Sequence, residues 1–405
     1  MKLNLHKGKT KDFRVQKQNR KRQQQYLKNK KKNRKNIDPV GQKLNVPTKS
    51  VLRINRDNWD TARKEVFGET FKKRNYKEAP KHVKLEGYFG VESDLDGFLE
   101  KAEEFVETKS SRYIFDLKKC ARMWPSGILL LVSLTHWWHL TSATKNRPLR
   151  GSIDPESEAV DSYLDHCGFY NYVKAEKRIR LGTKYSSDEV VKIVRETSRA
   201  NQETRHNEIY DLIKRRSALS DDELEWFNCV ILTEILANVS EHGVYHTEKA
   251  ETDYGWYNLT QCHPTHGFIS ICFADNGIGI KNSLVSGLQR EELKAILPQY
   301  EDNDGEYIKK SFEENVSGAY AASLRERKWF RKKYPRGKRR GNGLKRILDT
   351  CKLLKIPILI VSSKGAVSID EKGRMRSPVN KPKMVFAGTL IHLRVPAKKK
   401  EELEL

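Results

Sequence analysis

The sequence predicts a two-part fold: a small α/β domain over residues 81–180 and a larger α+β domain over 218–400. In the first part, short apolar runs alternate with stretches of helical periodicity, which is typical of an α/β domain with a partly parallel sheet. In the second part, several strand-like runs are joined by short loops and interspersed with helices. That pattern favours an α/β sandwich with helices on one face of a mixed sheet.

Composition excludes the N-terminus from both domains. Residues 1–36 carry fifteen Lys or Arg against a single acidic residue, Asp12, and account for more than half of the chain's net charge of +25. Such a segment cannot bury enough apolar surface to offset the entropy lost on ordering. We therefore expect a disordered basic tail over 1–50, followed by a linker over 51–80.

The cysteines and the hydropathy indicate an intracellular protein. Six cysteines are widely spaced without a C-x-x-C pair, which is typical of reduced cytosolic thiols. Cys262, His263 and His266 share one short loop, but such a group is more often incidental than metal-binding, so we expect no metal there. The most apolar run, 127–140, is too short and too polar to span a bilayer. We expect a cytoplasmic location and no membrane partner.

Hydrophobic periodicity and turn residues place the elements of the first domain. Apolar residues recur at helical spacing over 93–107, and Pro-Ser-Gly at 125–127 precedes an apolar helix. The expected helices are 93–107, 128–140 and 156–167, and the expected strands are 113–117 and 148–153.

A polar helical connector is expected over 181–217, with its helix at 186–217. Ser220 then opens a capping box with Glu223 at the start of a helix that ends near Gly243. Beyond it, 281–340 reads as a long irregular lid. The remaining expected elements are strands at 256–260, 268–273, 358–361 and 389–395 and a helix at 344–354.

The helix that begins at Ser220 carries a polar stripe. Glu234, Asn238 and His242 are four residues apart and so share one face over two turns. A carboxylate can orient and deprotonate a water, and an amide oxygen can complete a magnesium shell without adding charge. The alternative is an ordinary solvated helix face.

Three further short motifs follow along the chain. Asp275 ends a strand, where its carboxylate could accept a hydrogen bond from an exocyclic amine such as that of adenine. Gly277 and Gly279 would let the backbone approach a flat ring. Gly341 and Gly343 lie at the mouth of a helix, where free N–H groups and the helix dipole favour phosphate. Each of these also fits a plain turn. A hydroxyl at Thr389, after Gly388, could join the adenine contacts.

Taken in order, these motifs resemble those of the Bergerat-fold ATPases, the superfamily of gyrase, the heat-shock ninety chaperones, histidine kinases and mismatch-repair ATPases. The resemblance covers 215–398, and the His-Gly after Asn238 looks like that of the anti-sigma-factor serine kinases. It implies ATP and magnesium as cofactors. The glycine box is shorter and more basic than usual, and the segment from 279 to 341 is long for a small serine kinase. The roles that the resemblance implies are catalysis for Glu234, magnesium binding for Asn238, adenine contact for Asp275, Gly277, Gly279 and Thr389, and phosphate contact for Gly341 and Gly343.

The first domain resembles the STAS domains, which include anti-sigma-factor antagonists. The strand Ile114-Phe115-Asp116-Leu117, the Trp124-Pro125-Ser126-Gly127 loop and the following apolar helix carry the resemblance. In those antagonists a serine at the helix start is phosphorylated, and Pro125 occupies that position here. The resemblance therefore implies a STAS-like domain that has lost its switch. We expect it to dock permanently through helix 128–140, with the chain's own ATP-binding domain as one candidate surface.

A second basic segment precedes the phosphate glycines. Residues 325–340 hold ten Lys or Arg and one acidic residue, with three aromatic residues between them. Three interpretations remain open: a lid that meets the triphosphate, a nucleic-acid-binding strip, or a solvated charged helix. For the tail 1–36 the charge favours nucleic acid or an acidic protein over simple solubility.

These features together predict an intracellular regulator that binds Mg-ATP and either hydrolyses it slowly or phosphorylates a protein partner. The alternative is a non-enzymatic module in which ATP gates binding to a protein or to nucleic acid. The sequence leaves open whether two chains form a homodimer.

Overall fold

The structure is a computed structural model. It describes residues 81–92, 95–107, 113–141, 152–153, 155–173, 189–196, 202–242, 255–277, 279–285, 304–313, 316, 343–378 and 386–399. All of them belong to one compact unit, Ser50–Leu405. The predicted tail and linker, Gly341 and the basic segment 325–340 lie outside the described residues.

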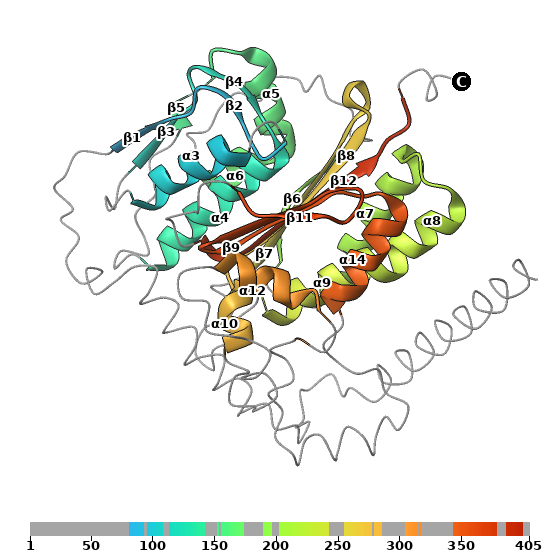
Figure 1. The fold of residues 1–405 in the computed structure, drawn as a ribbon. Coiled ribbons are helices and arrows are strands. Elements are labelled where there is room, and N and C mark those ends of the chain that lie inside the picture. The colour runs from blue at the N-terminus through green and yellow to red at the C-terminus, as the bar shows by residue number, and fades with distance from the viewer. Residues whose placement is uncertain are drawn as a thin grey trace, which may run out of the picture. The chain divides into compact units, whose positions relative to one another are not determined.

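A seven-stranded sheet with the order β11-β10-β9-β12-β8-β7-β6 forms the centre of this unit (Figure 1). Every pairing in it is antiparallel, so the predicted mixed sheet is wrong. Tight turns explain only part of this result: they join β7 to β8 and β9 to β10, and a tight turn reverses the strand direction. The pairings of β12 with β8 and β9, and of β6 with β7, join strands that are distant in the sequence. The strands are β6 (Val190–Glu196), β7 (Trp256–His263), β8 (Phe268–Asp275), β9 (Ile358–Ser363), β10 (Gly365–Ile369), β11 (Met375–Arg376) and β12 (Phe386–Pro396).

Both faces of the large sheet are buried. Along β8, Ile269, Ile271 and Phe273 belong to one hydrophobic cluster, whereas Cys272 and Ala274 belong to another. This alternation places successive side chains on opposite faces, as the pleat requires. The first face is covered by α7 (Gln202–Arg216), α8 (Asp221–Trp226), η2 (Phe227–Leu232), α9 (Thr233–His242) and α14 (Gly343–Leu354).

The helical run over 221–242 begins as predicted. The Ser220 hydroxyl accepts from the Glu223 N–H, and the Glu223 carboxylate accepts from the Ser220 N–H, which confirms the capping box. The run contains one π-helical segment, η2, between α8 and α9.

The N-terminal part forms two small parallel sheets, so the prediction of a partly parallel sheet is confirmed. One has the order β1-β3-β5 and the other pairs β2 with β4. The strands are β1 (Lys81–Lys84), β2 (Gly87–Phe89), β3 (Tyr113–Asp116), β4 (Cys120–Met123) and β5 (Ser152–Ile153), and the helices are α3 (Leu95–Glu107), α4 (Pro125–Thr141), α5 (Glu158–Cys167) and α6 (Phe169–Val173).

Helix α4 connects the two parts. Residues 128–132 of this helix are buried together with sheet residues such as Tyr257, Cys272 and Leu390, and the helix packs on β7, β8 and β12. A helix that is apolar all round is expected to be buried on every side. The chain thus covers the second face of its own large sheet with the helix that was expected to be a docking surface (Figure 1).

Two predicted segments need correction. The helical connector over 181–217 is wrong at 190–196, which forms the edge strand β6. Its Val and Ile residues favour extended backbone and pair with β7, and this tertiary pairing outweighs the polar residues between them. The predicted irregular lid 281–340 contains α12 (Asp304–Ser311), and α10 (Gly279–Val285) extends into it. An ion pair of 2.7 Å between Lys281 and Asp304 links these two helices.

Ser126, in the loop that resembles the antagonists, is buried. Its hydroxyl donates to Glu92 Oε2, and the Val91 N–H donates to Ser126 Oγ at 2.9 Å. Ser126 is 0% exposed, so no kinase could reach its hydroxyl without opening the core.

We predict that Ser126 takes no phosphate and tolerates no mimic of one. Protein incubated with Mg-ATP should show no phosphate at Ser126 by mass spectrometry. Ser126→Asp should lower the free energy of unfolding by several kcal/mol, since it places a second carboxylate beside the buried Glu92 (~3 kcal/mol or more). Ser157→Asp is the control, because Ser157 caps α5 and Asp is an equally good cap. Stoichiometric phosphate on Ser126 in folded protein would contradict this prediction.

Candidate functional site

Asp275 lies at the end of β8, directly opposite Thr389 of β12. Its side chain turns back on the chain, so that the Gly277 N–H donates to Oδ1 at 2.7 Å. The backbone N–H of Thr389 is a second donor to this carboxylate. This is the Asx type of turn, in which a short carboxylate satisfies the backbone that follows it. The register therefore places Thr389, to which the sequence assigned the same adenine role, beside Asp275.

Glycine at 388 is required for this approach. Gly388 has φ +89, and a Cβ there would lie 2.0 Å from the carbonyl oxygen of Asp275. Only a residue without a side chain allows β12 to pass so close to the Asp275 backbone.

Ser362 connects the elements around Asp275. Its hydroxyl donates to the Gly388 carbonyl at 2.9 Å and accepts from the Ile280 N–H at 2.9 Å. A Cβ on Gly279, which has φ +74, would be 2.9 Å from the same hydroxyl oxygen. The ends of β8 and β9, the start of β12 and the start of α10 therefore meet at one place, and Gly279 lies in it.

A second group of predicted residues meets between α9 and α14. A Cβ on Gly343, the first residue of α14, would lie 3.1 Å from Glu234 Oε2 and 3.9 Å from both amide atoms of Asn238. Glu234 also forms an ion pair with Arg346 of α14 through its other oxygen, Oε1. A carboxylate and an amide thus lie beside the N-terminal end of a twelve-residue helix.

The elements that carry these two groups of residues pack against each other. Helix α9 packs on β8, and Val239 of the helix shares a hydrophobic cluster with Phe273 of the strand. The structure thus brings together Glu234, Asn238 and Gly343 in one group and Asp275, Gly277, Gly279 and Thr389 in the other. The side chain of His242 and residue Gly341 lie outside the described residues.

Sequence reasoning missed several partners of this site. Arg346 is one turn into α14 and gave no signal beyond its charge. Ser362 lies at the end of an apolar strand, where a hydroxyl is unremarkable. Asn276 is fully buried and accepts from Ser133 Oγ of α4 at 2.5 Å. That contact joins the turn after Asp275 to the N-terminal part, and no local pattern in the sequence could indicate it.

Burial dominates the electrostatics of Asp275. Removal from water raises the pKa of its carboxyl to about 7, although the Gly277 and Thr389 N–H donors act in the opposite direction. Because this pKa lies close to neutral pH, a bound ligand can change the protonation state of the carboxyl group. A ligand that donates hydrogen bonds to it would favour the ionised form and release a proton.

The Cys262, His263 and His266 group does not converge on a common point. Cys262 is buried in the hydrophobic cluster on the sheet face that α7, α9 and α14 cover. The next residue, His263, packs edge-on against Trp124 on the opposite face. Burial lowers the pKa of His263 to about 3. His266 lies 2.7 Å from Arg122 through Nε2.

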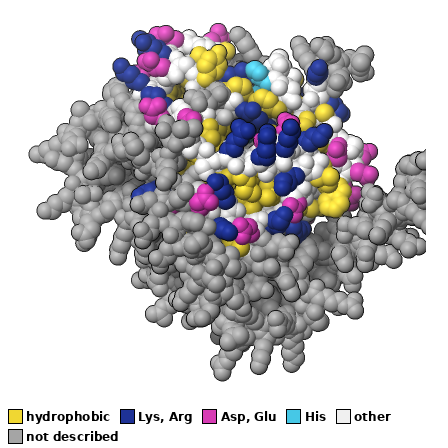
Figure 2. All heavy atoms as spheres, viewed as in Figure 1, with side chains coloured by type: hydrophobic (Ala, Val, Ile, Leu, Met, Phe, Trp, Pro, Cys, Tyr) yellow, Lys and Arg dark blue, Asp and Glu magenta, His cyan; other side chains and the backbone are white. Residues whose placement is uncertain are grey.

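Lys and Arg side chains gather in the middle of one face of the described molecule, with acidic side chains around them (Figure 2). The described residues therefore form a basic region of their own, in addition to the basic residues that the sequence places in segments 1–36 and 325–340. Among the described helices, none is long and apolar enough to cross a membrane.

Comparison with protein-family models, with curated proteins and with solved structures finds no match to this chain. The interpretation of the site therefore depends on its residues and their contacts.

We predict that Gly388→Ala destabilises the protein far more than Gly267→Ala. Both glycines have positive φ, +89 and +70, but only Gly388 has backbone in the way, since nothing lies within 4 Å of a Cβ on Gly267. The left-handed backbone should cost each variant about 1–2 kcal/mol. Gly388→Ala should cost several kcal/mol more, because β12 must move away from Asp275. Urea unfolding measures both, and equal losses would contradict the close approach.

Asp275 should make stability depend on pH near neutrality. Its pKa is raised in the folded state, so it stabilises the fold at low pH, and this contribution is lost as the pH rises from about 4 through about 7. The advantage of wild type over Asp275→Asn in free energy of unfolding should therefore shrink across that range.

The control for this experiment is Asp370→Asn. Hydrogen bonds from Arg374 lower the pKa of Asp370, so its contribution has the opposite sign and is lost as the pH falls through the lowered pKa. If the two variants show the same pH dependence, the assignment of the effect to Asp275 is wrong.

Proposed function

We propose that this chain is a regulatory protein that binds Mg-ATP and either hydrolyses it slowly or transfers its phosphate to a protein partner. The observation that carries the proposal is the pairing of residues far apart in the sequence. Asp275 lies against Gly388 and Thr389, and Glu234 and Asn238 lie against Gly343. ATP binding needs one group that recognises adenine and a second that holds the phosphates. The residues around Asp275 have the hydrogen-bonding chemistry for adenine, and those around Gly343 have the chemistry for phosphate and magnesium.

Asp275 would recognise adenine. Its carboxylate already accepts from two backbone N–H groups, and an exocyclic amine is a donor of the same kind. Gly279 and Thr389 lie around the same turn, so the ring would meet backbone and a hydroxyl rather than bulky side chains.

The start of α14 would hold the phosphates. Free N–H groups and the helix dipole favour an anion there. Asn238 would complete the magnesium shell with its amide oxygen. Glu234 would act as the general base. Because Glu234 Oε1 is paired with Arg346, the base would use Oε2, which is the oxygen nearer to Gly343.

The residues in these two groups are those to which the resemblance to the Bergerat-fold ATPases assigns roles. The sheet differs from the expected mixed sheet, because its strands are antiparallel throughout. A regulatory role is supported by Ser133 of α4, which donates to Asn276, the neighbour of Asp275. A nucleotide that moved this turn would also move the N-terminal part that packs on the sheet.

Calorimetric titration of ATP with and without magnesium tests the binding. Wild type should bind more tightly with the metal, and ATP at about 100 times its dissociation constant should stabilise the fold by about 2.7 kcal/mol. Asp275→Asn should abolish most of this shift, because an amide presents its own N–H donors to the adenine amine. Asn238→Ala should weaken binding only when magnesium is present. If wild type takes up no ATP, the proposed function is wrong.

Two variants separate catalysis by Glu234 from its ion pair. Glu234→Gln and Arg346→Met each break the pair, so both should lose a similar, small amount of stability. Only Glu234→Gln should abolish phosphate release while ATP still binds. If both variants retain turnover, Glu234 only holds α9 to α14. If both lose it equally, the pair rather than the base supports catalysis.

A further inference from the structure

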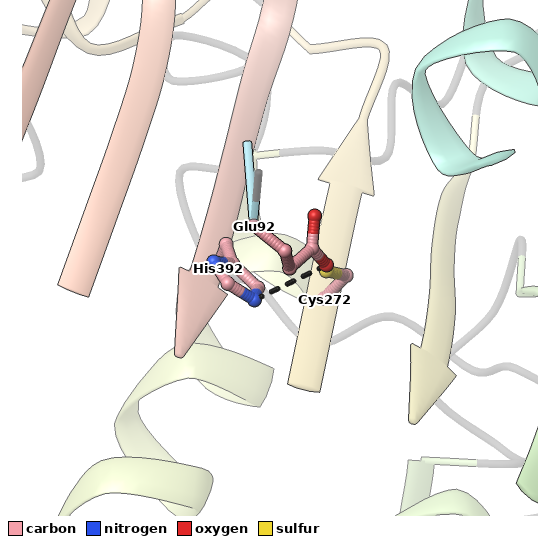
Figure 3. A group of neighbouring side chains, drawn as sticks. All are labelled: Glu92, Cys272 and His392. Atoms are coloured by element: carbon pink, nitrogen blue, oxygen red, sulfur yellow. Dashed lines mark ion pairs between the residues drawn. The ribbon is translucent and has the colours of Figure 1, made fainter. Parts of the chain in front are cut away.

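A second cluster of reactive side chains lies on the face of the large sheet that α4 covers. Cys272 of β8 and His392 of β12 are directly opposite each other in the register of the two strands. Side chains opposed in this way lie on one face and close together. Glu92, from the turn between β2 and α3, reaches the same point from the N-terminal part, and Figure 3 shows the three side chains directed toward one another.

The distances suit a small cation. One ligand atom from each of the three residues lies within 4.8 Å of the other two, and His392 Nε2 is 3.4 Å from Glu92 Oε1. A tetrahedral zinc with bonds of about 2.0–2.3 Å sets its ligands roughly 3.3–3.8 Å apart, so shifts of up to about 1 Å complete the site. A fourth candidate ligand atom, Ser270 Oγ, lies 2.9 Å from both Glu92 Oε1 and His392 Nε2 and 3.8 Å from Cys272 Sγ.

The charges of this cluster balance a divalent ion. The side chains of Glu92 and Cys272 are fully buried and that of His392 is 4% exposed. A neutral His392 imidazole offers a lone pair to the ion, and zinc binds cysteine as the thiolate. The proton of the Cys272 thiol would leave for solvent as the metal–sulfur bond forms.

Groups around the cluster hold Glu92 in place. Ser126 Oγ donates to its Oε2, and the Arg394 guanidinium donates to its backbone carbonyl. Hydrogen bonds of this kind orient a metal ligand and are typical of metal sites in proteins. Arg394 is the one cation that these contacts bring to the described cluster, and its guanidinium lies over the Phe268 ring, 5.1 Å from the centroid.

We infer that Glu92, Cys272 and His392 bind one structural zinc ion, with Ser270 as the fourth ligand. One thiolate, one imidazole and one carboxylate form the mixed ligand set that suits zinc, whereas calcium and magnesium take oxygen ligands. The ion joins the turn before α3 to the two central strands of the large sheet. Cys272 is three residues before Asp275 on β8, so the ion would also stiffen the strand pair that ends at the proposed nucleotide site.

The first experiment measures metal in the wild-type chain. Protein purified from zinc-supplemented cells should contain about one zinc per chain by mass spectrometry. Replacement by cobalt should give tetrahedral ligand-field bands and a thiolate-to-cobalt charge-transfer band. Folded wild type without stoichiometric zinc and without this band would overturn the inference, as would a cobalt spectrum with oxygen ligands alone.

Variants assign the ligands. Cys272→Ser and His392→Asn should lose zinc and the charge-transfer band, whereas Cys351→Ser, which changes another buried free thiol on α14, should keep both. Retention of the band in Cys272→Ser would overturn the assignment. If the ligand variants do not fold, the wild-type cobalt spectrum still decides, because it reports thiolate ligation directly. ATP titration of the zinc-free protein separates this site from the proposed function, since either can fail alone.

Discussion

The antiparallel register of β8 against β12 is the constraint on which the rest of the structure depends. It sets Asp275 opposite Thr389 at one end and Cys272 opposite His392 further along. Because both faces of these strands are buried, a shift of one residue would exchange their two sets of side chains. The glycine at 388 lets the strands approach closely enough to keep this register where β12 begins.

Covering the second face of the sheet from within the chain has consequences for polar residues. Ser133 and Ser126 of α4 are buried, and each finds a partner: Asn276, across the interface with the sheet, for the first, and Glu92, within the N-terminal part, for the second. A polar group buried without such a partner costs free energy comparable to a lost hydrogen bond, so these contacts fix how the helix sits. The N-terminal part is therefore joined to the turn beside Asp275 by specific bonds as well as by apolar packing.

Much of the candidate site was predictable because its residues obey local rules. Glu234 and Asn238 share a helix face by spacing alone, Asp275 ends an apolar strand, and Gly343 begins a helix. The capping box at Ser220 was equally local. Strand β6 and the direction of the strands were not predictable in the same way. A short run of Val and Ile beside charged residues becomes a strand only when a neighbouring strand offers it hydrogen bonds, as β7 does here.

The sequence by itself determined most of the element types outside β6 and the lid, the parallel pairing in the N-terminal part and which residues to examine around the candidate nucleotide site, because periodicity, caps and turn residues act within a few positions. Only the tertiary structure decided that Arg346 pairs with Glu234, that Ser362 links three elements, and that Glu92 meets Cys272 and His392. Those contacts join residues more than a hundred positions apart in several cases. They arise from strand register and from burial of the sheet between α4 and α9, which no local pattern encodes.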